Sequence, residues 1–163
     1  MDLGTAIIAL IVVIISILPF ALVNISNKKK KKETIKTILA FAKKYNYTIS
    51  EYDIWGKSAI GIDESAHMLF SYGKINRTEN GLQFNLRDIE KCKVLINGRP
   101  MTDKANKLMV IDLIELAFSY NAKNKEDTVL EFYNKAYDNL HISNELELAE
   151  KWCKQVITHS KAS

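Results

Sequence analysis

The chain has 163 residues and a formal net charge of +4, with 23 Lys and Arg against 19 Asp and Glu. Once Asp2 and the tract Lys28–Lys32 are set aside, 18 basic and 18 acidic residues remain, so the rest of the chain is neutral. A nucleic-acid-binding domain normally carries its basic surplus as a patch on the folded domain. We therefore expect no nucleic-acid partner.

Residues 3–23 form a run without a single charged side chain. As a helix such a run would reach roughly 31 Å, enough to cross a hydrocarbon core of about 30 Å. A cleaved signal peptide is the rival interpretation, but the run lacks a basic n-region and a clear small-residue cleavage site. The sequence thus predicts a transmembrane anchor at 1–27, with the lipid bilayer as partner through residues 3–23.

Five consecutive lysines follow this run: Lys28, Lys29, Lys30, Lys31 and Lys32. The positive-inside rule then predicts a single-pass membrane protein with its amino terminus outside and its carboxyl-terminal domain in the cytoplasm. The five lysines are also the predicted membrane-surface site. They either set topology alone, which we favour, or additionally contact anionic lipid headgroups.

The next segment, 28–47, is predicted to be a polybasic juxtamembrane stretch and an amphipathic helix. Its apolar side chains recur at helical spacing: Ile35, Ile38, Leu39, Ala42 and Tyr45. This helix either packs on the following domain or lies along the bilayer surface. We favour packing, because the apolar stripe is narrow and the segment has few lysines for a surface-bound helix.

Short apolar runs separated by polar turns indicate an antiparallel β domain over 48–163. The expected strands are 48–55, 58–63, 67–72, 81–86, 90–97, 108–120 and 128–134. Turns are expected at 63–66, at 76–81 and at Asn97-Gly98, a pair that tolerates positive φ. The apolar residues of 108–120 are too dense to show a period, so strand and buried helix both stay open there.

A final helix is predicted from Asn144 to about His159. Asn144 and Glu147 fit the N-cap and N3 positions of a capping box. Trp152 falls on the apolar side of this helix and should bury a large area against the sheet.

Six short strings resemble bacterial PH-like domains (the pleckstrin-homology superfold) of small membrane proteins. They are Ile60-Gly61-Ile62-Asp63, Leu69-Phe70-Ser71-Tyr72, Leu86-Arg87-Asp88-Ile89, Cys92-Lys93-Val94, Ile114-Glu115-Leu116 and Leu130-Glu131-Phe132-Tyr133. The resemblance implies a seven-stranded sheet or barrel capped by a C-terminal helix. The expected fold class is therefore a single transmembrane helix followed by an α+β, mainly antiparallel β domain.

This resemblance also implies a binding module without chemistry of its own. In lipid-binding members, basic residues of the first interstrand loop grip an inositol phosphate. Here that loop is Gly56-Lys57-Ser58, whose single lysine speaks against phosphate capture.

Candidate chemical groups are scattered along the sequence. Cys92 and Cys153 are 61 residues apart among apolar neighbours and fit a reduced, buried pair. The histidines (His67, His141 and His159) show no metal-ligand spacing. Asp112 and Glu115 would point to opposite faces of a strand but would be neighbours on a helix. We expect no catalytic, cofactor-binding or metal site, and hence no enzyme.

A loose aromatic set, Tyr45, Tyr47, Tyr52, Trp55 and Tyr72, either lines a groove or, as we favour, packs in the core. The predicted function is a membrane-tethered, non-catalytic interaction or scaffold domain facing the cytoplasm, with a protein partner or self-association. The alternative is a sensor of the anionic membrane surface that uses the lysine tract and the following helix.

Overall fold

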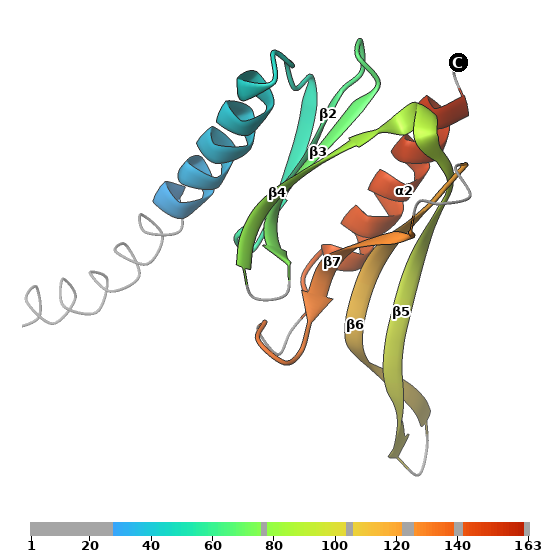
Figure 1. Ribbon diagram of the computed structural model, residues 1–163. Coiled ribbons are helices and arrows are strands. Elements are labelled where there is room, and N and C mark those ends of the chain that lie inside the picture. The colour runs from blue at the N-terminus through green and yellow to red at the C-terminus, as the bar shows by residue number, and fades with distance from the viewer. Residues whose placement is uncertain (1–27, 76–77, 104–105, 122–125, 139–141, 162–163) are drawn as a thin grey trace, which may run out of the picture.

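The computed structural model describes residues 28–75, 78–103, 106–121, 126–138 and 142–161. A helix over 28–44 comes first, followed by seven strands, one 3-10 turn and a C-terminal helix (Figure 1). The elements are β1 (Glu51–Trp55), β2 (Ser58–Asp63), β3 (Met68–Ile75), β4 (Thr78–Asn85), η1 (Leu86–Asp88), β5 (Ile89–Asp103), β6 (Asn106–Tyr120), β7 (Thr128–Asn134) and α2 (Glu145–Lys161).

The strands form two antiparallel sheets, not the single seven-stranded sheet or barrel that was predicted. One sheet has the order β1-β2-β3-β4 and the other the order β5-β6-β7. The expected β2 and β7 match the observed bounds, whereas β5 is much longer than expected. Residues 108–120 are strand, which settles the choice that the sequence left open.

The sheet β1–β4 is covered on both faces. On one face the helix at 28–44 buries Ile38 and Ala42 against Ala59 of β2 and Phe70 of β3. Gly81 of β4 allows the helix to come close, because a Cβ at that position would lie 2.8 Å from the Phe41 ring. The helix thus packs on the domain, as favoured from its narrow apolar stripe.

The other face of β1–β4 meets the main hydrophobic core. Because side chains alternate along a strand, Ile60 and Ile62 of β2 point away from the helix and into this core. The second sheet and α2 complete it with Ile114, Leu116, Phe118, Leu148, Trp152 and Val156. The core therefore lies between the two sheets and α2.

Polar contacts attach α2 to β1 at the edge of this core. Trp152 is fully buried, and its indole N–H donates a hydrogen bond of 2.9 Å to Asp53. Lys151 forms ion pairs with Asp53 at 2.6 Å and with Glu51 at 2.8 Å. These hydrogen bonds raise the pKa of Lys151, with Asp53 contributing most. Two adjacent helix residues thus fix the position of α2 on the sheet.

The turn at 63–66 forms as predicted. Asp63 is buried, and its carboxylate accepts hydrogen bonds from the Ser65 hydroxyl at 2.6 Å and from the backbone N–H groups of Ala66 and Thr48. Burial alone would raise the pKa of Asp63, but these hydrogen bonds outweigh it and lower the pKa. Asp63 is therefore a structural turn residue.

The turn predicted at Asn97-Gly98 is wrong. β5 continues through these residues to Asp103, and the register against β6 shifts between Asn97 and Gly98. A Cβ at Gly98 would lie 2.6 Å from the carbonyl oxygen of Val110, so this glycine serves a bulge with close backbone approach. Beyond the segment of β6 that pairs with β7, β5 and β6 extend as a long two-stranded ribbon (Figure 1).

The predicted transmembrane anchor at 3–23 lies outside the described residues. Within the residues that the structure describes, no helix combines the length and the apolar character needed to cross a membrane. The expectation of a single-pass membrane protein, with its amino terminus outside and its domain in the cytoplasm, is corrected on this finding. Lys28–Lys32 form the start of the helix at 28–44, whose apolar stripe faces the sheet.

Candidate functional site

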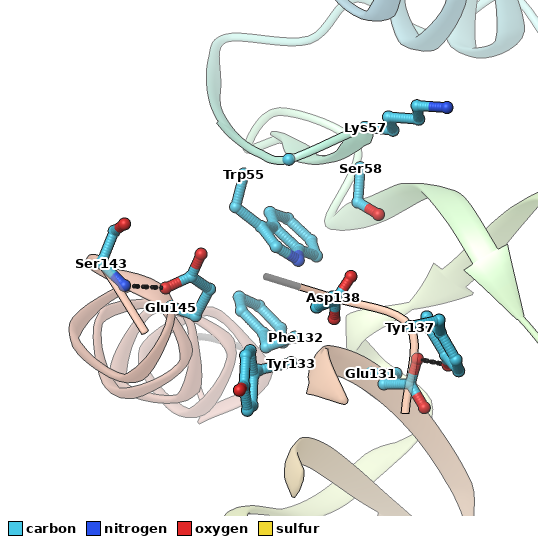
Figure 2. A pocket seen from close by; sticks show the side chains of 11 residues that line it. Trp55, Lys57, Ser58, Glu131, Phe132, Tyr133, Tyr137, Asp138, Ser143 and Glu145 are labelled. Carbon is cyan, nitrogen blue, oxygen red and sulfur yellow. Dashed lines mark hydrogen bonds between the residues drawn. The ribbon is translucent and has the colours of Figure 1, made fainter. Parts of the chain in front are cut away.

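A cleft of about 300 Å³ opens where the β1–β2 turn faces the end of β7 and the start of α2. Figure 2 shows the side chains that surround it. Its walls come from three separate parts of the chain: Trp55, Gly56, Lys57 and Ser58; Glu131, Phe132, Tyr133, Tyr137 and Asp138; and Ser143 and Glu145. No single stretch of sequence therefore contains the site.

Two stacked aromatic rings form the floor of the cleft. The rings of Trp55 and Phe132 lie parallel, with centroids 4.2 Å apart. Only 7% of Trp55 and 2% of Phe132 is exposed, so little of either residue is open to solvent. β6 pairs with Tyr133 and Glu131 of β7 through the consecutive residues Ile114 and Glu115, so Phe132 is the extra residue of a bulge. This bulge explains why the consecutive residues Phe132 and Tyr133 are both buried.

The β1–β2 turn holds the first wall in place. Trp55 pairs with Ser58 across a tight hairpin whose turn residue Gly56 has a φ of +51°. Glycine adopts this conformation without the Cβ penalty that other residues would incur. The turn therefore places Trp55 at the edge of the sheet, where its ring can reach β7.

The second wall is a short turn after β7, stabilised by its own side chains. Asp138 accepts a hydrogen bond of 2.7 Å from the backbone N–H of Asn134, and the Asn134 side chain accepts one from Ala136. Glu131 accepts hydrogen bonds from the Asn134 amide at 2.8 Å and from the Tyr137 hydroxyl. These contacts orient the Tyr137 ring, which is 39% exposed and is the accessible aromatic surface of the cleft.

Glu145 provides the third wall at the start of α2. Its carboxylate accepts hydrogen bonds from the backbone N–H groups of Ser143 at 2.6 Å and of Asn144 at 3.0 Å. The capping box was expected to use Glu147, but Glu145 is the acidic residue that reaches back to these donors. An acidic side chain in the first turn is favourable because it faces the positive end of the helix dipole.

The cleft is negatively charged. Burial raises the pKa of Glu131, and the neighbouring charge of Asp138 adds to the shift. Burial also raises the pKa of Tyr133, with additional contributions from the negative charges of Asp138, Asp112 and Glu145. Lys57 is the one cation among the described lining residues, and Figure 2 shows its side chain extending away from Asp138 and Glu145. A cation placed between these carboxylates would be stabilised.

Several residues singled out in the sequence lie elsewhere. Tyr47 and Tyr72 pack with the helix at 28–44, as the core-packing interpretation expected. Trp55 packs in the main core and also lines the cleft. Core packing is wrong for Tyr45 and Tyr52, which are exposed. Asp112 and Glu115 form no pair, because Asp112 binds Arg99 at 2.7 Å and Lys135 at 3.3 Å. Within the described residues, no three His, Cys, Asp or Glu side chains are grouped to hold a metal ion.

Cys92 and Cys153 do come together, at the contact between β5 and α2. Both are free thiols, with Cys92 buried and Cys153 half-buried. Burial, followed by a hydrogen bond with Cys153, raises the pKa of Cys92. A thiol held protonated in this way is a poor nucleophile, so Cys92 is structural.

The sequence did not identify the second and third walls of the cleft. Glu131, Phe132 and Tyr133 were noted only as part of a strand, and Tyr137, Asp138 and Glu145 carried no prediction of a site. The one usable signal was Gly56-Lys57-Ser58, the loop at which the family resemblance places ligands. In the structure this loop lies beside the carboxylates of the cleft.

No protein-family model matches the chain, and no curated protein or solved structure is similar enough to count as a relative. The resemblance to PH-like domains therefore stays a prediction. The fold and the cleft define a class only: an α+β domain of two antiparallel sheets and a C-terminal helix, with an aromatic, acidic cleft at their junction.

Proposed function

We propose that the chain is a non-catalytic interaction module that binds a protein partner through the cleft between the β1–β2 turn, β7 and α2. The observation that carries this proposal is the combination of Trp55, Phe132 and Tyr137 with a rim of carboxylates. Aromatic anchors inside a charged rim are typical of the centres of protein interfaces. The volume of about 300 Å³ suits one inserted side chain better than a large cofactor.

The chemistry of the lining residues also favours binding over catalysis. The described lining residues include neither cysteine nor a histidine that could act as base beside the two serines, Ser58 and Ser143. Glu131, Asp138 and Glu145 each accept hydrogen bonds that hold the local backbone or a neighbouring side chain. Their negative charge remains available to a partner, while their positions are fixed in advance of binding.

A photo-crosslinking amino acid at position 57, in the full chain and in cells, tests this proposal. Lys57 lies at the rim of the cleft and is exposed, so its replacement leaves the floor intact. The matched control places the same group at Lys93, an exposed position on β5. We expect a defined protein adduct from position 57 and none of the same mass from position 93. The same adducts from both positions, or none from position 57, would contradict the proposal.

A second variant links the adduct to the cleft itself. Tyr137→Ala removes the exposed ring and the hydroxyl that donates to Glu131. We expect this change to reduce the adduct at position 57 by at least about fivefold, as loss of an aromatic anchor does at an interface. An undiminished adduct in a folded Tyr137→Ala variant would mean that the partner binds next to the cleft and not in it.

A further inference from the structure

We propose that the occupant of the cleft is a lysine side chain from the tract Lys28–Lys32 of a second copy of this chain. This inference rests on the proposed function and names its partner. Its first support is charge complementarity, since the cleft carries Glu131, Asp138 and Glu145 and the tract carries five cations.

The tract is presented for contact. All five lysines are exposed, and none forms an ion pair with another described residue. Successive residues of an α-helix are rotated by about 100°, so five lysines in a row point in all directions around the helix. At least one of them therefore faces a neighbouring molecule whichever way the helix is approached.

The tract of the same molecule is poorly placed to fill the cleft. The helix at 28–44 packs through Ile38 and Ala42 on one face of β1–β4, whereas Trp55 belongs to the core on the other face. Figure 1 shows the lysine end of this helix on the far side of β1–β4 from β7 and α2. Insertion into its own cleft would require the helix to detach from Ala59 and Phe70, so the favourable arrangement joins two molecules.

The chemistry of the cleft fits a lysine in detail. The aliphatic stem can lie against the exposed part of Trp55, while the ammonium group reaches Asp138 or Glu145. Each of these contacts is individually weak at a solvent-exposed site, so we expect transient association that covalent trapping can capture.

The tract and the cleft are different surfaces, so one contact leaves one tract and one cleft unused. These two surfaces can bind each other reciprocally in a two-fold dimer, or they can bind further copies in a head-to-tail series. Crosslinked products that stop at two chains indicate the dimer, and a ladder in steps of one chain indicates the series.

The test uses full-length protein with the photo-crosslinker at position 57, prepared in unlabelled and nitrogen-15-labelled forms and mixed before irradiation. We expect adducts between position 57 and the segment 26–33 that join one labelled and one unlabelled copy. Adducts that join only segments of the same copy would overturn the inference. Adducts to a different protein, with none between copies, would also overturn it but would leave the proposed function standing.

Charge-removal variants show whether the carboxylates cause the contact. Asp138→Asn with Glu145→Gln keeps a side-chain oxygen acceptor at both positions and removes two negative charges. The control, Glu64→Gln with Glu126→Gln, removes two charges from exposed residues outside the cleft. We expect the mixed-isotope adduct to fall at least about fivefold in the first pair and to stay unchanged in the control, as for the loss of two surface ion contacts.

Salt provides a measurement that needs no variant. Raising sodium chloride to about 0.5 M shortens the screening length to a few ångströms and should reduce the adduct of the parent protein by a similar factor. The inference would be overturned if both variant pairs reduced the mixed-isotope adduct equally. It would also be overturned if neither salt nor Asp138→Asn with Glu145→Gln changed the amount of that adduct. Complete absence of adducts at position 57 would remove the proposed function along with it.

Discussion

Replacement of Trp152 tests how α2 is held against the sheets. This side chain is fully buried in the main core, and its indole N–H donates to Asp53. Truncation of a buried aromatic residue to alanine costs about 3–5 kcal/mol, from lost burial and from the cavity that remains. Trp152→Ala should therefore remove much of a total stability that is commonly about 5–15 kcal/mol for a native protein.

A second substitution divides this loss into its parts. Trp152→Phe keeps most of the aromatic packing and removes the hydrogen bond to the Asp53 carboxylate, which should cost about 1.5–3 kcal/mol. Val129→Ala is the control, because Val129 is 43% exposed and its truncation should cost less than about 0.5 kcal/mol. Urea unfolding followed by far-ultraviolet circular dichroism measures all three. Equal stability of Trp152→Ala and Val129→Ala would refute the described core.

Three further predictions concern titratable groups. Lys151→Met should cost about 1 kcal/mol at neutral pH, since it removes two partly exposed ion pairs. The hydrogen bond from Lys151 lowers the pKa of Glu51, so the difference in stability between the parent and Lys151→Met should shrink as the pH falls below about 4.5. A difference in urea midpoint that stays the same at every pH would contradict this prediction. Burial raises the pKa of Glu131, so ionisation of this carboxyl group destabilises the folded protein. The stability of Glu131→Gln should therefore increase relative to that of the parent as the pH rises above about 4.5. Cys92 should react with a maleimide far more slowly than Cys153 in the native state. Mass spectrometry of timed samples measures the two rates, and equal rates would contradict the prediction.

Local patterns predicted most of the secondary structure because the relevant information is local. The bounds of β2 and β7, the turn of Asp63 and the inward position of Trp152 follow from alternation, turn chemistry and helical period. Asn97-Gly98 was misread because the same pair that favours a hairpin turn also suits a bulge. The choice between the two depends on the strand that lies opposite, and the sequence does not show it.

The division into two sheets and the cleft could not be predicted in this way. The sheet β1–β4 is buried on both faces, and this burial depends on which strands and helices pack against it. The sequence of β2 would show the same pattern whether the strands formed one sheet or two. The cleft joins Trp55 to Phe132 across 77 residues of chain, counted from their positions, and no spacing rule connects them. The acidic rim was equally hidden, because Asp138 and Glu145 resemble ordinary turn and helix-start residues.

The fluorescence of Trp55 measures occupation of the cleft most directly. Trp55 and Trp152 are the two tryptophans of the chain, so the Trp152→Phe variant leaves Trp55 as the sole indole reporter. Titration of this full-length variant with a pentalysine peptide should change the Trp55 emission in a saturable way, and added salt or Asp138→Asn with Glu145→Gln should weaken the effect. An emission that does not respond to pentalysine, or that responds equally to pentaglutamate, would contradict a cleft that binds cationic side chains.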